Sequence, residues 1–443
     1  LTKWTVRAQT LETLPHIMSR ALNVATTGSP GPVAVIVPGP LWAAESEFNI
    51  VSPTEVAHYP ASRTDPGVDP IQRAAALLIA AEKPAIVAGG GIMLSRASEQ
   101  LIELAERSGA PVATTHVAHG SFPSSHPLSL GVLGNPNAGN RGRIANKIVG
   151  EADVVLLVGT RMDAATTRGH TLLSPNAQLI QIDIDPQQIG SNYPVEVGIV
   201  ADANLALQAL TRVLAEKVSR EPVIADSARA GEIAAMMEEW REEFNPQMTA
   251  DSIPIKTPRL FKEIQECIGE DTIVVVDAGS SSYWAPAYLE LTPENHALYP
   301  RGAAALGSGF PMAAGAQAAA PDKKVVCISG DGAFGYNIME LETVVRLNLP
   351  VVNIVVNNQT LGMEHRGYLQ YAGEIPPEAT YFSPQDFSKI AQAYGCLGVR
   401  VESPGELRGA ITAALASGRP AVIDVVTDRE DSDSEATRPW RSY

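Results

Sequence analysis

Two short polar segments, each at the end of an apolar run, hold the residues whose types could do chemistry together. Gly330-Asp331-Gly332 ends the run 324–329, and Asn357-Asn358 ends the run 350–356. Glycine lets the backbone approach a ligand closely, and the N–H groups at the start of a helix favour an anion. Asp331 adds a carboxylate oxygen, which is a hard ligand for a divalent cation. This combination predicts a site for an anionic ligand held through a metal ion.

The spacing of the two segments predicts that they meet. Asn358 lies 27 residues after Asp331 (358 − 331), and a strand–helix–strand crossover has about this length. Two side-chain oxygens, one backbone carbonyl and a diphosphate would complete an octahedral Mg²⁺ site. The simpler alternative is a tight turn at Gly-Asp-Gly and a strand-ending Asn pair. The flanking strands and the crossover length favour the metal site.

Alternating helix and strand patterns indicate the elements that must position this site. From 257 to 427 we expect helices over 258–267, 309–319, 337–347 and 384–393, and strands over 272–276, 324–329, 350–356 and 421–426. From 69 to 213 we expect helices over 70–81 and 98–108, and strands over 85–88, 111–115, 153–158 and 178–184. Short continuous apolar strands between helices are typical of parallel sheets. The sequence therefore predicts an α/β protein with two doubly wound, largely parallel-sheet domains.

The remaining segments predict a remnant of a third domain and connections. An amphipathic helix over 10–24 and a strand over 33–37 make half of a βαβ unit, so residues 1–40 are interpreted as a domain remnant. Residues 41–68 are interpreted as a linker and 428–443 as a loose tail. Residues 214–256 are interpreted as a surface linker with a charged helix over 232–243.

Composition excludes several classes of protein. The chain has 443 residues and a formal net charge of −16, which disfavours nucleic acid as a partner. Three widely spaced cysteines exclude a disulfide framework and suit a reducing compartment, so we expect a cytoplasmic protein. We find no run of 18 apolar residues and expect no membrane partner.

These segments resemble the thiamin-diphosphate-dependent 2-oxo-acid decarboxylase and carboligase superfamily over essentially the full chain. Gly307-Ser-Gly-Phe-Pro311 is similar to that family's segment under the aminopyrimidine, and Asp277-Ala-Gly279-Ser280-Ser281 to its first diphosphate loop. The triple glycine at 89–91 and the segment 182–186 resemble its central domain, and 31–38 resembles the end of its N-terminal domain. Within the superfamily the chain is most similar to acetolactate synthase-like and benzaldehyde lyase-like enzymes.

The resemblance implies a role for each matching position. It assigns Mg²⁺ to Asp331, Asn358 and the carbonyl of Thr360, and it assigns diphosphate contacts to Ser280, Ser281, Gly330, Gly332, Ala333 and Gly362. It makes Leu306 the apolar wedge between the two cofactor rings, and the carbonyl of Ala304 the acceptor for the cofactor's amino group. Met363 would face the substrate. His365, two residues later, could move a proton near neutral pH.

The resemblance implies a thiamin-diphosphate- and Mg²⁺-dependent enzyme that decarboxylates a 2-oxo acid and then joins the remainder to a second carbonyl. One alternative is a lyase that splits 2-hydroxy ketones or 2-hydroxyacyl thioesters. A second is a scaffold that binds the cofactor without turnover. A third, a nicotinamide-dependent dehydrogenase, is disfavoured because no GxGxxG with its acidic partner follows a strand.

Three further expectations depend on the same resemblance. The family's activating glutamate lies in the N-terminal domain, and Glu12, Glu45 and Glu47 do not match its context, so we expect that most of that domain is missing from this sequence. Active sites shared between subunits imply a homodimer or homotetramer. The central domain of relatives holds FAD, ADP or neither, and Ala164-Ala165 after Gly159-Thr-Arg161-Met-Asp163 disfavours FAD. His116 and His119 are interpreted as surface or hinge residues.

Overall fold

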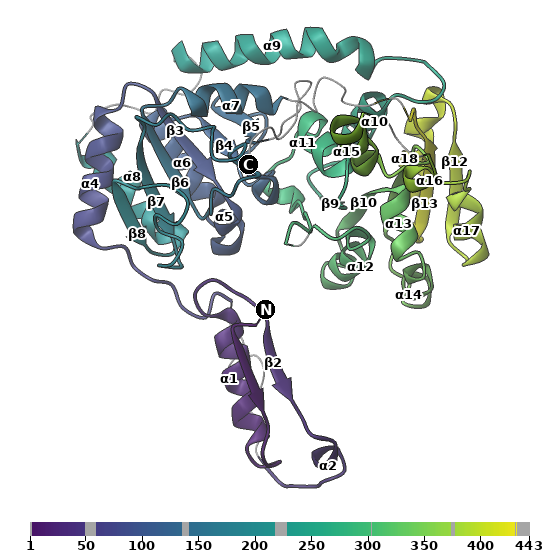
Figure 1. The fold of residues 1–443 in the computed structure, drawn as a ribbon, viewed down its shortest axis with the longest axis horizontal. Helices are drawn as coiled ribbons and strands as arrows, with labels where there is room; N and C mark the ends of the chain where they lie inside the picture. The colour runs from purple at the N-terminus through teal and green to yellow at the C-terminus, as the bar shows by residue number, and fades with distance from the viewer. Residues whose placement is uncertain are drawn as a thin grey trace.

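The chain forms three α/β units that follow one another along the sequence (Figure 1). The computed structural model describes residues 2–48, 59–134, 141–217, 228–302, 304–373, 377–429 and 431. Within these residues the named strands form sheets of two, six and five strands, and every pairing between them is parallel. This confirms the predicted α/β class, with two large parallel sheets and one small additional unit.

The C-terminal unit is built on the five-stranded sheet, in the order β12-β13-β11-β10-β9. Its strands are β9 (Thr272–Val276), β10 (Lys324–Gly330), β11 (Val352–Asn357), β12 (Leu397–Val401) and β13 (Ala421–Val426). Its helices are α10 (Thr257–Cys267), α11 (Ser281–Tyr288), η2 (Pro293–Asn295), α12 (Gly309–Ala319), α13 (Asp331–Tyr336), α14 (Glu340–Arg346), α15 (Gly362–Ala372), α16 (Pro377–Thr380), α17 (Phe387–Ala393), η3 (Pro404–Glu406) and α18 (Leu407–Ala416). The inner strands are buried along almost their whole length, as expected for a parallel sheet between helices.

The central unit contains the six-stranded sheet, in the order β5-β4-β3-β6-β7-β8. Its strands are β3 (Pro84–Ala88), β4 (Val112–Thr114), β5 (Ser129–Val132), β6 (Val154–Val158), β7 (Gln178–Asp183) and β8 (Val197–Val200). Its helices are α4 (Val68–Ala80), α5 (Gly90–Ser95), α6 (Ser98–Ser108), η1 (His116–Ala118), α7 (Gly142–Gly150) and α8 (Ala203–Lys217). The strand order reverses between β3 and β6, and ligands of doubly wound sheets bind outside the carboxyl ends at such a point.

A long helix, α9 (Ala228–Met248), lies along the top of both large units in Figure 1. Trp240 on this helix is buried and packs against Tyr288 of α11, with 5.8 Å between ring centroids. Glu243 accepts a 2.5 Å ion-pair contact from Arg143 of α7. The predicted linker thus contains a helix, as expected, and this helix buries Ala230, Ile233 and Trp240 while its carboxylates stay in water.

The N-terminal unit is a small βαβ unit that projects below the central unit in Figure 1. It consists of β1 (Trp4–Arg7), α1 (Leu14–Thr26), β2 (Val33–Ile36) and the short α2 (Gly39–Trp42). None of the eight strand residues is fully buried. Residues 49–58 of the predicted linker lie outside the described residues.

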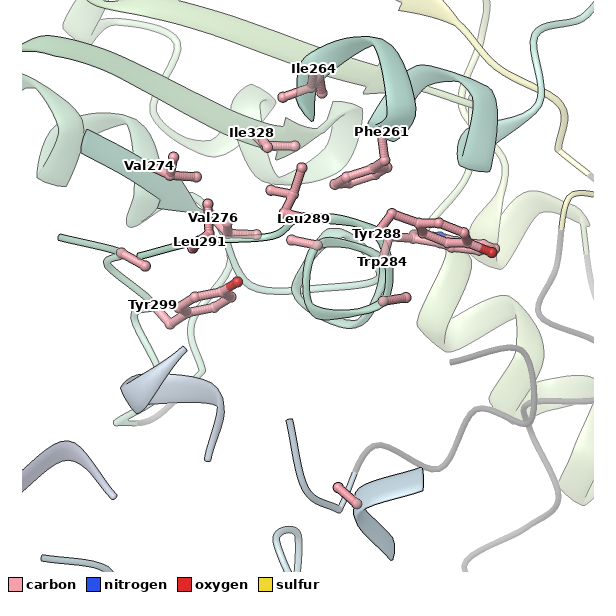
Figure 2. Packing of buried hydrophobic residues seen from close by; sticks show 14 of the residues in the cluster. Phe261, Ile264, Val274, Val276, Trp284, Tyr288, Leu289, Leu291, Tyr299 and Ile328 are labelled. Carbon is pink, nitrogen blue, oxygen red and sulfur yellow. The ribbon is translucent and has the colours of Figure 1, made fainter. Parts of the chain in front are cut away.

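One cluster of buried apolar side chains includes residues of both large units, such as Leu157 of β6 and Val274 of β9. Figure 2 shows the part of this cluster where Phe261 of α10 lies beside Leu289 and α11. Each such fully buried side chain contributes about 2 kcal/mol. The two large units therefore share a packed core and do not depend on the connecting chain alone.

The strands that the sequence failed to predict lie at sheet edges. β5 and β8 are the two outer strands of the central sheet, and β12 is an outer strand of the C-terminal sheet. Their sequences, SLGV, VGIV and LGVRV, contain glycine or polar residues, and β8 alternates between buried and exposed positions. These residues interrupt the continuous apolar run that predicts a strand, whereas β9, which is also an outer strand, has such a run, TIVVV, and was predicted.

Candidate functional site

The paired strands β10 and β11 end at the same edge of the C-terminal sheet. Gly330 lies opposite Val356 in the parallel register, so the residues that follow each strand come together. A pocket at this edge is lined by both Asp331 and Asn358. The two segments that the spacing predicts to meet therefore lie in one site.

Asp331 is buried, with 5% of its surface exposed, and one of its carboxylate oxygens lacks a hydrogen-bond partner. Oδ1 accepts the N–H of Gly332 at 2.7 Å, whereas Oδ2 has no partner within the described part of the chain. Burial raises the pKa of Asp331 to about 7, against the N–H groups of Gly332, Gln359 and Thr360, which lower it. A buried, unpartnered carboxylate oxygen is costly unless a cation or donor completes it.

The Asn pair divides into a structural residue and a pocket residue. Asn357 is buried, and its Nδ2 donates to Asp424 Oδ1 at 2.8 Å, while Arg400 Nη1 lies 2.6 Å from Asp424 Oδ2. Asn358 lines the pocket, and its Oδ1 accepts the N–H of Thr360 at 3.2 Å. The buried Asp424 network therefore fixes the strand end that immediately precedes Asn358.

The predicted diphosphate residues form the wall around this carboxylate. Six of them line the pocket: Ser280, Ser281, Gly330, Gly332, Ala333 and Gly362. A Cβ on Gly362 would lie 3.1 Å from Ser280 Oγ, and a Cβ on Gly332 would lie 2.7 Å from Leu361 Cδ2. Both glycines are thus in positions where a side chain would fill the pocket or displace its wall. A carboxylate oxygen without a partner, next to helix N-termini that contain glycine, suits a diphosphate bound through a metal ion.

Of the residues predicted to contact the cofactor rings or the substrate, some line this pocket and one does not. Leu306 is half-buried and lines the pocket, and a Cβ on Gly279 would lie 3.4 Å from its Cδ2. Met363 also lines the pocket and is 38% exposed. Ala304 is exposed, has a φ of 51° and is not among the described residues that line the pocket. Its expected carbonyl contact stays a prediction.

His365 lines the same pocket but is held by its surroundings. It is 6% exposed, its ring stacks on Tyr381 with 5.3 Å between centroids, and Nδ1 lies 3.4 Å from Thr380 Oγ1. Arg429 covers the Tyr381 ring at 4.3 Å. This packing positions α15 against the segment that follows α16, and the proton-moving role of His365 stays a prediction.

Two arginines of the pocket were missed by the sequence analysis. Arg366 Nη2 donates to Ser280 Oγ at 2.8 Å, and Arg429 Nε donates to the carbonyl of Asn358 at 3.3 Å. Arg366 lies one helical turn after Gly362, a spacing that could have indicated it. Arg429 belongs to the stretch predicted as a loose tail. That prediction is wrong for Asp428, which pairs with Lys256 at 2.7 Å, and residues 430 and 432–443 lie outside the described part.

A second buried carboxylate, Asp277, supports the loop that carries Leu306. Burial raises its pKa to about 6, while the N–H groups of Ala278, Gly309 and Gly307 lower it. Ala278 donates to Oδ1 at 2.7 Å, and a Cβ on Gly309 would lie 2.7 Å from the Asp277 Cβ. Only a glycine fits at position 309, so Asp277 and the 307–309 turn are packed together.

A larger cavity, of about 540 Å³, lies where the order of the central sheet reverses, and residues of all three units line it. Gly90, Gly91, Gly159, Arg161 and Asp183 are among its lining residues. The glycines have a packing reason: a Cβ on Gly91 would lie 2.6 Å from Gly159 Cα, and one on Gly159 would lie 2.5 Å from Gly91 Cα. The triple glycine therefore reflects the contact of two loops and is not by itself evidence of a nucleotide.

The interpretation of His119 as a surface residue is wrong. It is 2% exposed, and its Nδ1 lies 2.8 Å from the hydroxyl of Tyr299, which belongs to the C-terminal unit. Burial and, to a smaller extent, the nearby charge of Arg141 together lower the pKa of His119 to about 3. Burial also lowers the pKa of His116 to about 3. Both side chains are therefore neutral near pH 7 and lie where the two large units meet.

Metal-binding clusters and membrane spans were sought in the described ranges. No group there brings together three or more His, Cys, Asp or Glu side chains that could hold a metal ion. A metal at Asp331 would thus depend on amide, carbonyl and non-protein oxygens. None of the helices described is long and apolar enough to cross a membrane.

Comparisons with known proteins agree with this geometry. The family model described as "Thiamine pyrophosphate enzyme, central domain" matches residues 71–210, and "Thiamine pyrophosphate enzyme, C-terminal TPP binding domain" matches 277–425. A probable acetolactate synthase large subunit of Methanocaldococcus jannaschii is 34% identical over 97% of this chain and 72% of its own length. A probable acetolactate synthase large subunit of Methanococcus aeolicus is 33% identical over 94% of this chain and 70% of its own length. The acetolactate synthase isozyme 3 large subunit of Escherichia coli is 30% identical over 94% of this chain and 72% of its own length.

Proposed function

Because the chain belongs to the thiamine pyrophosphate enzyme family and is related to acetolactate synthase large subunits, we propose that it decarboxylates a 2-oxo acid and joins the product to a second carbonyl. The cofactors would be thiamin diphosphate and Mg²⁺. The observation that carries the proposal is the unpartnered Oδ2 of buried Asp331, which shares a glycine-walled pocket with Asn358. A divalent ion bound there would both complete this oxygen and anchor a diphosphate.

The residues of the chain divide into three tasks in this proposal. Asp331, Asn358 and the Thr360 carbonyl would hold Mg²⁺, and the glycines and serines around them would receive the diphosphate. When bound, thiamin diphosphate supplies the electron sink for cleavage next to a carbonyl. Leu306 and Met363 would give the reacting end an apolar surface that excludes water. Asp277 and Asp424 would position the loops that carry these groups.

The deciding experiment measures Mg²⁺-dependent binding of thiamin diphosphate by calorimetry. We expect Asp331→Ala to weaken binding by at least about 100-fold, since removing one partner of a buried charge interaction costs about 3 kcal/mol or more. Asp322→Ala, an exposed carboxylate in the same unit, is the matched control and should bind as the wild type does. Equal binding by both variants, or binding that ignores chelation of Mg²⁺, would refute the proposed site.

Product analysis separates the proposed reaction from the related lyase. With pyruvate as substrate, the proposed enzyme releases CO₂ and forms an acetohydroxy acid, whereas a 2-hydroxy ketone lyase would cleave benzoin. The named relatives favour the first reaction. A chain that binds the cofactor but converts neither substrate would correspond to the inactive scaffold.

We further propose that the central cavity holds an adenine nucleotide, FAD or ADP. Its volume of about 540 Å³ and its place at the reversal of the sheet support this, because pockets for such ligands measure about 300–1,000 Å³. Asp183, at the end of β7, provides a carboxylate suited to ribose hydroxyls. Denaturing the purified protein and analysing the released nucleotide by chromatography and absorption would identify FAD, ADP or neither.

We also propose a cytoplasmic homodimer or homotetramer. Tyr336 and Met339 of the C-terminal unit are each 70% exposed, and neighbouring large exposed apolar side chains favour contact with another protein surface. The three cysteines are free thiols, which suits a reducing compartment. Light scattering coupled to gel filtration would test the assembly, and a monomeric mass at micromolar concentration would contradict it.

A further inference from the structure

Arg366 connects the starts of two helices at the mouth of the Asp331 pocket. It lies in the second turn of α15, and its Nη2 donates to Ser280 Oγ at 2.8 Å, immediately before α11 begins. Ser280 Oγ would also lie 3.1 Å from a Cβ on Gly362, the first residue of α15. Arg366, Ser280 and Gly362 therefore form one cluster across the pocket.

The direction of the side chain places its charge where an anion is favoured. Long helical side chains point back toward the N-terminus of their helix, so Arg366 covers the first turn of α15. The N–H groups of that turn carry partial positive charge. The unpartnered Oδ2 of Asp331 belongs to the same pocket, which is independent evidence that a ligand with a cation is received there.

The other guanidinium of the pocket has a different position. Arg429 covers the ring of Tyr381 at 4.3 Å and donates to the Asn358 carbonyl at 3.3 Å and to Gln359 Oε1 at 3.3 Å. It thus supports the Asn358 loop through the backbone of Asn358 and the side chain of Gln359. Arg366 is the guanidinium that reaches the serine loop assigned to the diphosphate.

We propose that Arg366 is a further cofactor-binding residue, which donates to the terminal phosphate of thiamin diphosphate together with Ser280. This inference rests on the proposed function and deepens it. A guanidinium and a hydroxyl are both donors, so each can exchange their mutual hydrogen bond for a phosphate oxygen. A 2-oxo acid carboxylate offers the same chemistry, but the hydrogen bond of Arg366 to Ser280 places the guanidinium at the serine loop that is assigned to the diphosphate.

The test compares thiamin diphosphate, thiamin monophosphate and thiamin, each with Mg²⁺, by calorimetric titration of the full chain. We expect Arg366→Gln to weaken binding of the diphosphate by about 10- to 100-fold, the usual value of a charge-assisted hydrogen bond. Binding of the monophosphate and of thiamin should change by less than about 2-fold, and Arg366→Lys should restore part of the loss. Arg346→Gln removes an exposed guanidinium of α14 that pairs with Glu342 and should bind as the wild type does.

The other outcomes overturn the inference in distinguishable ways. An equal loss for all three ligands, with a lowered melting temperature, would assign Arg366 a structural role. Unchanged binding of the diphosphate with weakened binding of pyruvate to the loaded protein would assign it to the substrate carboxylate. If the wild type binds none of the three ligands, the proposed function fails as well, whereas a failure confined to Arg366→Gln leaves that function intact.

Discussion

The two large units present the same kind of sheet edge and differ in what lies there. The central edge has a cavity of about 540 Å³, and its Asp202 carboxylate is satisfied by Arg63 at 2.7 Å and by Ser95 at 2.8 Å. The C-terminal edge has a space of only about 60 Å³, but Asp331 there keeps an unpartnered oxygen. Cavity size therefore does not by itself identify a ligand site. In the described part of the chain Oδ2 of Asp277 also lacks a partner, so it is the position of Asp331 in a glycine-walled pocket that suits a cation.

The glycines at the two sheet edges also differ, in what occupies the space beside them. Gly91 and Gly159 pack backbone against backbone, so their lack of a side chain serves the fold of the central unit. Gly332 and Gly362 lie against side chains that line a pocket, so their lack of a side chain leaves room for a ligand. Substitutions at these positions should separate stability from binding.

The largest effect should come from Gly159→Ala in the central unit. The new Cβ would lie 2.5 Å from Gly91 Cα at a φ of 58°, so both overpacking and backbone strain act, and we expect a loss of about 3 kcal/mol or more in unfolding free energy. Urea denaturation would measure it. Gly109→Ala shares a positive φ of 70° but meets no atom within 4 Å, so it should lose only about 1 kcal/mol. Equal losses would mean that the Gly91–Gly159 contact can relax.

Elements and site residues that are marked by continuous apolar segments could be predicted from the sequence, whereas residues whose role depends on tertiary contacts could not. Buried inner strands such as β10 and β11 have continuous apolar runs, and their crossover length brought Asp331 to Asn358. The partners of Arg366 and Asp424 could not be found in this way, because they are 86 and 67 residues distant in the sequence. The same limit explains His119, whose polar neighbours indicate a surface loop although Tyr299 of another unit buries it.

A second, smaller effect on the unfolding free energy is expected at acidic pH and comes from His119, where the two large units meet. The pKa of His119 is about 3 in the folded chain and about 6.5 when unfolded, so the unfolded chain binds more protons between these values. Stability from this residue is present above pH 6.5 and is lost as the pH falls toward 3. We expect His119→Gln to remove about 3 kcal/mol of the loss of stability between pH 7 and pH 4, as measured by urea denaturation.

Two buried carboxylates of the C-terminal unit change the stability with pH in the opposite direction, and their effect must be separated from that of His119. Burial raises the pKa of Asp331 to about 7 and that of Asp277 to about 6, so their contribution to stability falls as the pH rises through this range. Both carboxylates are present in the wild type and in His119→Gln. The difference between the two curves of unfolding free energy against pH therefore isolates the contribution of His119. His16→Gln, at an exposed position of α1, is the control. Parallel curves for His119→Gln and wild type would show that the imidazole has the same pKa in the folded and the unfolded chain.

The smallest effect on stability, and the sharpest contrast with Gly159, is expected for Gly332→Ala. The new Cβ would lie 2.7 Å from Leu361 Cδ2 and 3.2 Å from the ring of Phe382, which are ends of side chains that can shift, so the unfolding free energy should change by less than about 1 kcal/mol. The methyl group and the displaced Leu361 would nevertheless reduce the pocket, and affinity for thiamin diphosphate should fall by about 10-fold. Gly335→Ala on the same helix meets no atom within 4 Å and should leave the affinity unchanged. If Gly332→Ala binds the cofactor as tightly as Gly335→Ala, Gly332 serves packing as Gly159 does, and the contrast between the two edges would rest on Asp331 alone.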